Sequence, residues 1–175
     1  MLVLVVGPSG AGKDTLLDAA KQKLAGDARF RFVRRVITRP DDAGGEAHES
    51  VTEAEFARRD FALQWQAHGL HYGLPVEAIT RDAVVVANVS RTVIAEAARH
   101  YPTRVIEITA PPAVLAARLA ARGRESADDI AARLTRSVTV PPGVMLETVV
   151  NDGTLEQGVQ RFLAALNRAA ADAAR

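Results

Sequence analysis

Short apolar runs rich in β-branched residues alternate along the chain with segments whose apolar positions recur at helical spacing. The continuous runs predict buried strands at Leu2–Val6, Phe30–Ile37, Ala83–Val89, Val105–Thr109 and Thr148–Asn151. The segments between them predict helices at Lys13–Leu24, Arg91–His100, Ala113–Arg122 and Asp128–Val138. Strands that alternate with helices indicate a three-layer α/β fold, in which helices flank a parallel sheet and the crossovers are right-handed.

Two capping boxes mark the starts of further helices. Thr154-Leu155-Glu156-Gln157 predicts a last helix that begins near Leu155 and runs towards the C-terminus. Thr52-Glu53-Ala54-Glu55 predicts a short helix that carries Phe56. This short helix lies within residues 38–75, where glycines, histidines and mixed polarity break the alternation of strands and helices. We expect that insertion to carry a binding site.

Composition narrows the class of protein. The 175 residues show no repeat, linker or charge block, so we expect a single domain over 1–175. With 22 basic and 21 acidic residues, the chain is too balanced for a protein whose main task is binding nucleic acid. It has no cysteine, which excludes disulfides and thiolate chemistry. The first apolar run is too short for a signal peptide or membrane span, which predicts a cytoplasmic protein.

The first strand leads directly into a glycine-rich segment. Its sequence is Gly7-Pro8-Ser9-Gly10-Ala11-Gly12-Lys13-Asp14, which has the G-x-x-x-x-G-K spacing of a P-loop. Glycines allow successive N–H groups to turn inward around a phosphate, and the following helix points its positive end there. Lys13 can then reach the β- and γ-phosphates of ATP. The alternative is a strand-to-helix turn without a ligand.

The P-loop departs from the usual pattern at Asp14, where a serine or threonine ordinarily contacts Mg²⁺. A carboxylate beside phosphates is repulsive unless it also faces the metal, directly or through water. Alternatively, Asp14 caps the helix and the metal is held elsewhere. Thr15 is one residue late for this role, and we expect it to point away.

Further segments follow the P-loop in an order that resembles the guanylate kinases. They are Ile37-Thr38-Arg39-Pro40, Gly45-Glu46, Gln64-Trp65, His71-Tyr72-Gly73, Leu115–Arg124, Ile130–Leu134 and Val150-Asn151-Asp152. The resemblance spans nearly the whole chain and rests on the collinearity of short motifs. It implies a P-loop fold of the nucleoside-monophosphate-kinase type, a substrate-binding insertion over 38–75 and a lid region over 118–136.

The chain departs from guanylate kinases where those enzymes read guanine. Gln64 stands at the position of their glutamate, and Glu46–Phe56 is too short to supply their tyrosine. A carboxylate accepts from both donors of guanine, whereas an amide presents an NH₂ to one of them. An unpaired buried donor costs about 1–3 kcal/mol, which is enough to reject the base.

The chain combines a P-loop that ends in aspartate with the absence of the residues that read guanine. In this combination it is similar to the ribose 1,5-bisphosphate phosphokinases of phosphonate degradation. The segments Asn88-Val89-Ser90-Arg91 and His68–Gly73 also resemble that family. The resemblance implies that ATP, with Mg²⁺, phosphorylates the 1-phosphate of ribose 1,5-bisphosphate to 5-phosphoribosyl 1-diphosphate. Rival readings are a guanylate kinase with an altered base pocket and a guanylate-kinase-like interaction module without catalysis.

The arginines suit a phosphate acceptor, whose oxygen is anionic at neutral pH and needs no general base. Arg118 and Arg122 share a helical face, Arg133 lies on the next predicted helix, and Gly123 between them makes a hinge. A solvated basic face is the alternative. We expect Lys13, Arg122 and Arg133 to act in catalysis.

Other positions are assigned through the substrate or the family. A substrate with two phosphates needs anion sites beyond the P-loop, for which Arg35, Arg39 and Arg91 are candidates. The resemblance adds Glu46 and Tyr72 to the substrate site, and Arg118 and Asn151 to the ATP site. Trp65 and Tyr72 are also expected to pack the insertion. His48, His68 and His71 lack the spacing of a zinc site and are expected to bond substrate hydroxyls or loop backbone, and His100 is expected to complement the dipole of the helix that it ends.

Overall fold

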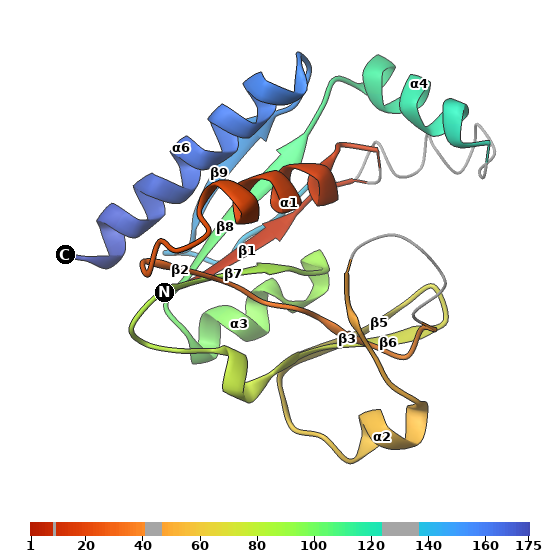
Figure 1. The fold of residues 1–175 in the computed structure, drawn as a ribbon, viewed down its shortest axis with the longest axis vertical. Helices are drawn as coiled ribbons and strands as arrows, with labels where there is room; N and C mark the ends of the chain where they lie inside the picture. Colours follow the sequence, from red (N-terminus) through yellow and green to blue (C-terminus); the bar gives the residue numbers. More distant parts are fainter. Residues whose placement is uncertain (9, 41–46, 124–136) are drawn as a thin grey trace.

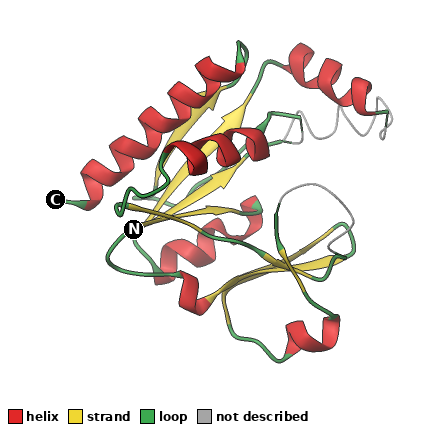
Figure 2. Cartoon of the chain, viewed as in Figure 1, coloured by secondary structure: helices red, strands yellow, loops and turns green. Residues whose placement is uncertain are grey.

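A computed structural model describes residues 1–8, 10–40, 47–123 and 137–175 of the chain (Figures 1 and 2). Its main sheet has five strands in the order β2-β7-β1-β8-β9, and every neighbouring pair is parallel. The strands are β1 (Leu2–Val6), β2 (Phe30–Phe32), β7 (Val84–Asn88), β8 (Thr103–Thr109) and β9 (Met145–Val150). The predicted parallel sheet is therefore confirmed, with β8 and β9 beginning two and three residues earlier than the pattern indicated.

The central strand shows how three layers form. Alternate side chains of a strand point to opposite faces. Val3 and Val5 pack in one core with α1 (Lys13–Lys23), α4 (Pro112–Arg122) and α6 (Leu155–Ala173). Leu2, Leu4 and Val6 pack in a second core with α3 (Ile94–His100) and with a smaller sheet. Because each core covers one face of β1, the strand is buried along its whole length.

The smaller sheet is built by the insertion together with the strand just before it. Its order is β4-β3-β6-β5, and its strands are β3 (Val36–Ile37), β4 (Glu49–Ser50), β5 (Phe61–Ala67) and β6 (Leu70–Pro75). Helix α2 (Glu53–Ala57) follows β4, with the predicted capping box and a buried Phe56. In Figure 1 this sheet lies below the main sheet, next to α3. Leu63, Trp65, Tyr72 and Leu74 attach it to the second core.

The prediction of one strand over Phe30–Ile37 is wrong. The chain pairs with β7 as far as Phe32, leaves the main sheet, and resumes pairing in the smaller sheet as β3. Arg34 and Arg35 lie between the two strands, and the Arg34 guanidinium donates to the His48 backbone oxygen at 2.6 Å. One apolar run thus serves two sheets, with the polar pair at the crossing.

The predicted helices that lie within the described residues are confirmed, and α1 begins at Lys13 as predicted, whereas α4 begins at Pro112, one residue early. The segment Arg91–His100 opens as a 3₁₀ turn, Arg91–Val93, in which the backbone N–H of Thr92 donates to the Ser90 hydroxyl, and then continues as α3. Helix α6 has the predicted capping box at Thr154. The predicted helix Asp128–Val138 lies mostly outside the described residues, and its last two positions are not helical. No helix in the described ranges is both long and apolar enough to cross a bilayer.

A buried ion network fixes α6 to the sheet. Arg104 on β8 is 5% exposed and donates to Glu147 of β9 at 2.7 Å and to Asp172 of α6 at 2.5 Å. Burial raises the pKa of the Glu147 carboxyl, but hydrogen bonds from Arg168 and Arg104 outweigh it and leave that pKa below its usual value. The network lies at the far end of the strands from the P-loop, so it acts on the scaffold.

Candidate functional site

The P-loop connects β1 to α1 through glycines whose backbone no other residue adopts easily. Gly10 and Gly12 have φ angles of 86° and 83°, in the left-handed region, and Gly12 is the N-cap of α1. A Cβ atom on Gly7 would lie 2.1 Å from the backbone oxygen of Ile108. The loop is therefore closely packed on the end of β8. Ser9 lies outside the described residues.

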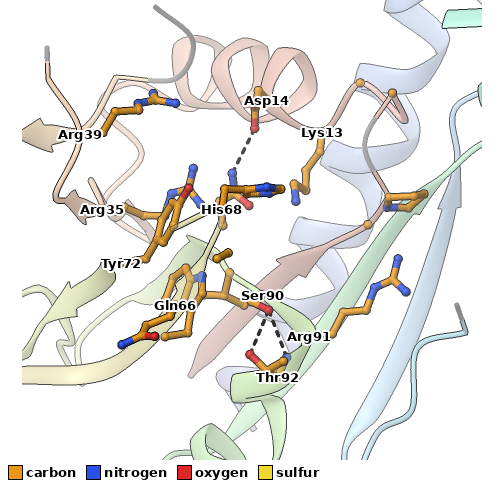
Figure 3. Close-up of a pocket in the computed structure, with 18 of the residues that line it drawn as sticks. Lys13, Asp14, Arg35, Arg39, Gln66, His68, Tyr72, Ser90, Arg91 and Thr92 are labelled. Atoms are coloured by element: carbon orange, nitrogen blue, oxygen red, sulfur yellow. Dashed lines mark hydrogen bonds between the residues drawn. The ribbon is translucent and has the colours of Figure 1, made fainter. Parts of the chain in front are cut away.

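A cleft of about 990 Å³ opens in front of this loop (Figure 3). It lies between the P-loop with the start of α1, the segment that follows β7, and the β5–β6 hairpin of the insertion. The polar and aromatic residues that line it are Lys13, Asp14, Thr15, Arg35, Arg39, Trp65, Gln66, His68, Tyr72, Asn88, Ser90, Arg91, Thr92, Arg122 and Ser137. Thr15, expected to point away, lines the cleft instead.

The charges of the cleft favour a polyanion. Five cationic side chains, Lys13, Arg35, Arg39, Arg91 and Arg122, come from four parts of the chain. Asp14 is the carboxylate among the described lining residues. Such convergence concentrates positive potential at a helix N-terminus, where phosphates bind. The predicted Arg133 and Glu46 lie outside the described residues.

Arg35 is held in the cleft by an aromatic stack. Its guanidinium lies 5.3 Å from the centre of the Tyr72 ring, and Tyr72 in turn stacks on Trp65 with centroids 5.5 Å apart. Both rings are less than a tenth exposed, so the expectation that they pack the insertion is confirmed. An arginine stacked on an aromatic face is positioned by the ring, and its planar guanidinium can donate to two oxygens of one phosphate.

Arg39 is held by a buried histidine. His48 is 5% exposed, and its Nε2 lies 3.1 Å from the backbone oxygen of Arg39, which can only accept. Nε2 therefore carries the hydrogen, and Nδ1 accepts from Nη2 of Arg39 at 3.3 Å. The Ser50 hydroxyl donates to the same backbone oxygen at 2.5 Å. For His48, the expected bond to loop backbone is confirmed.

Asp14 does not cap α1. The N-cap is Gly12, which has no side chain to offer, and Asp14 lies in the first turn, where its Oδ1 accepts from Nδ2 of Asn88 at 3.0 Å. The capping alternative is therefore wrong. The described residues contain no group of three His, Cys, Asp or Glu that could hold a metal ion. A Mg²⁺ ion here would suit the single carboxylate, because Mg²⁺ keeps several waters and takes the rest of its ligands from substrate phosphates.

Two residues expected near ATP lie against the P-loop backbone. Arg118 donates to the backbone oxygens of Gly10 at 3.1 Å and of Asn151 at 3.0 Å. The Asn151 amide donates to the backbone oxygen of Ala11 at 2.7 Å. A Cβ on Gly12 would lie 2.6 Å from Nδ2 of Asn151, and one on Gly158 would lie 2.3 Å from its Oδ1. Neither Arg118 nor Asn151 lines the described part of the cleft, so their contact with ATP stays a prediction.

Two glutamines of β5 differ in their relation to the cleft. Gln64, which stands at the position of the base-reading glutamate of guanylate kinases, is exposed and does not line the cleft. Gln66 lines the cleft instead. Gln64 and Gln66 are both exposed on the same face of β5, opposite the buried Leu63 and Trp65, so the alternation of the strand could not tell which of the two reaches the cleft.

The chain resembles known proteins along most of its length. A model of the AAA domain family matches residues 2–138. The "Ribose 1,5-bisphosphate phosphokinase PhnN" of Brucella melitensis is 52% identical over 170 residues, which cover 92% of this chain and 88% of that protein. The protein of that name from Acidiphilium cryptum is 51% identical, with 95% and 92% covered.

Other relatives are longer. The "Bifunctional ribose 1,5-bisphosphokinase-thymidine phosphorylase" of Cupriavidus necator is 55% identical over 171 residues, and the chain spans only 28% of its length. Among solved structures, a guanylate kinase from Anaplasma phagocytophilum matches with a TM-score of 0.61, 17% identity, and coverage of 97% of this chain and 85% of that one. A gluconokinase from Sinorhizobium meliloti matches with a TM-score of 0.52 and 18% identity, covering 97% and 93%. These structural matches support a P-loop kinase fold.

Proposed function

The chain belongs to the AAA domain family and to the ribose 1,5-bisphosphate phosphokinases, and from this premise we propose that it transfers the γ-phosphoryl group of ATP to ribose 1,5-bisphosphate. The acceptor is the 1-phosphate, and the products are 5-phosphoribosyl 1-diphosphate and ADP. The observation that carries the proposal is one cleft in which five cationic side chains converge, from the P-loop, the two ends of β3, the segment after β7 and α4. A substrate pair with phosphates at several points requires that arrangement.

The reaction asks little covalent chemistry of the protein. An oxygen of the acceptor's 1-phosphate attacks the γ-phosphorus, and the bond from that phosphorus to the bridging oxygen of ADP breaks. Because the attacking oxygen is already anionic, no group has to remove a proton. The side chains therefore position the two anions in line and neutralise their mutual repulsion.

The cationic residues divide by origin. Lys13, at the start of α1, is assigned to the β- and γ-phosphates, and Arg122, at the end of α4, lines the same cleft. Arg35 and Arg39 flank β3, next to and within the insertion where acceptor binding is proposed, and Arg91 joins them from the turn after β7. Water exclusion falls to the lid region 118–136, of which residues 124–136 lie outside the described part.

Mg²⁺ is proposed as the metal that neutralises charge on the bridged phosphates, with Asp14 as its protein contact, directly or through water. The Asn88 amide fixes the orientation of that carboxylate at 3.0 Å. A carboxylate that is held beside the P-loop repels the phosphates unless a cation lies between the two anions.

Replacing Asp14 with serine tests this metal role. Serine restores the hydroxyl usual at this position, so the enzyme should stay active, while the Mg²⁺ concentration for half-maximal rate should rise because a charged ligand is lost. The measurement is initial rate against Mg²⁺ concentration at fixed ATP. Asp18→Ser, at an exposed position of the same helix, serves as the matched control. If the Asp14→Ser curve superimposes on the wild-type curve, Asp14 has no part in holding the metal.

The function itself is tested by comparing acceptors. ADP release is measured with ribose 1,5-bisphosphate and with GMP at equal concentrations, and ³¹P NMR identifies the product. We expect turnover with the sugar bisphosphate and the appearance of a diphosphate ester at the 1-position. Faster turnover with GMP would make the protein a guanylate kinase. Absence of ADP release with either acceptor, while ATP still binds, would reject a phosphotransferase of either kind.

A further inference from the structure

The tip of the β5–β6 hairpin has an unusual backbone. Ala67 pairs with Leu70, so His68 and Gly69 form a two-residue turn, and both have positive φ angles, 52° and 73°. Two positive φ angles define the type I′ turn, whose twist matches that of the flanking strands. Within the described part of the chain, His68 is the one residue other than glycine with a positive φ.

Histidine is not the residue that this turn requires. Asn-Gly and Gly-Gly are the favoured pairs, because asparagine and glycine enter the left-handed region at little cost. A histidine there keeps a strained backbone that the turn alone would not select. Strain of this kind is concentrated at functional sites, which indicates a role for the His68 side chain.

The His68 side chain enters the cleft. It lies among the lining residues and is exposed to solvent, and in Figure 3 its ring is seen between Tyr72 and Lys13. It has no hydrogen-bond or ion-pair partner among the residues that the structure describes. Its neighbours on the hairpin, Gln66 and Tyr72, also line the cleft. The imidazole therefore faces the site from the insertion, opposite the P-loop.

The charges of the other lining residues indicate which part of the substrate the His68 imidazole would contact. The phosphates of both substrates are matched by the lysine and the arginines, whereas the part of a pentose bisphosphate between its two phosphates offers hydroxyl groups. A neutral imidazole has one donor and one acceptor nitrogen. Either nitrogen can bond a hydroxyl, because a hydroxyl both donates and accepts. We propose that His68 is a specificity-determining residue that hydrogen-bonds a ring hydroxyl of the acceptor sugar; the proposal rests on the function proposed above.

Two variants separate the side chain from the turn. His68→Gly removes the imidazole and keeps a residue that accepts positive φ, so the melting temperature should not fall. His68→Asn forms Asn-Gly, the favoured pair of this turn, with an amide too short to take the place of the ring. Both should lower kcat/KM for ribose 1,5-bisphosphate by about tenfold, mainly through KM, without changing the KM for ATP. Recovery of wild-type kinetics by asparagine would assign His68 to the turn and overturn the proposal.

Acceptors that lack one hydroxyl identify the contact. With 2-deoxyribose and 3-deoxyribose 1,5-bisphosphates, the tenfold difference between wild type and His68→Gly should disappear for one of the two analogues, because its lost hydroxyl was the partner. An equal loss on all three acceptors would show that the imidazole does not read a hydroxyl. His100→Asn, at the end of α3 and away from the cleft, is the control and should behave as wild type.

The outcomes for this residue and for the function are distinct. Wild-type enzyme that fails to phosphorylate ribose 1,5-bisphosphate rejects the proposed function. Wild-type enzyme that does so, with His68→Gly equal to it on every acceptor, leaves the function standing and rejects only the role of His68.

Discussion

Lys13→Ala is expected to lower turnover by at least about 100-fold while the fold stays intact. Lys13 is the first residue of α1 and its side chain lines the cleft rather than either core. It is placed to neutralise charge that develops between the β- and γ-phosphates during transfer, and this charge is greater in the transition state than in bound ATP. The loss should therefore appear in kcat, measured by ADP release under saturating substrates. Far-UV circular dichroism and the melting temperature should match those of the wild type.

Lys21→Ala provides the matched control, because Lys21 is an exposed lysine in the last turn of the same helix. It removes one positive charge from α1 at a distance from the cleft and should leave turnover unchanged. Near-normal kcat in Lys13→Ala would remove the P-loop assignment, whereas an equal loss in Lys21→Ala would point to a general effect on α1.

Arg39→Ala should raise the KM for ribose 1,5-bisphosphate by about 10- to 100-fold and slow transfer, because a charge-assisted contact to a phosphate is lost. The Arg39 guanidinium already has a defined position, because His48 is bound to both Nη2 and the backbone oxygen of Arg39. A preorganised cation contributes more to binding than a mobile one. Initial rates at varied acceptor and saturating ATP give the KM, and titration calorimetry gives nucleotide affinity without acceptor. We expect that affinity to stay constant.

The control for Arg39 is Arg99→Ala, an exposed arginine near the end of α3 that does not line the cleft. Its kinetics should equal those of the wild type. If Arg39→Ala weakens ATP binding as strongly as it raises the acceptor KM, Arg39 serves the donor site and the assignment of the insertion to the acceptor is wrong.

The main sheet could be predicted because its signals are local. Leu2–Val6 is apolar at every position and ends at a glycine, so both the strand and its end are fixed by neighbouring residues. Phe30–Ile37 has the same apolar character, yet it supplies two sheets, because pairing depends on β7 and β6, whose paired residues lie 35 or more positions away. Periodicity within a run cannot report which partner it will find.

The candidate site was predictable only in part for the same reason. The P-loop motif places Lys13 and Asp14 without knowledge of the fold. Arg35 and Arg39 were selected for their charge and their place beside the insertion, and the structure brings both to the cleft. His68 reaches the cleft through a turn whose two residues share positive φ angles. The insertion's β5–β6 hairpin was missed because its alternating polarity was interpreted as a break in the pattern.

The fit of Asn151 between two glycines limits how this chain can change over evolutionary time. Any side chain at Gly12 or Gly158 would collide with its amide, at 2.6 Å and 2.3 Å. A smaller residue at Asn151 would relieve the collision but leave the Ala11 backbone oxygen without its 2.7 Å donor. We expect neither substitution to be tolerated without the other, because each one disturbs the loop that carries Lys13. We therefore expect the three positions to be inherited together across descendants, while the exposed hairpin tip is free to diverge with the acceptor.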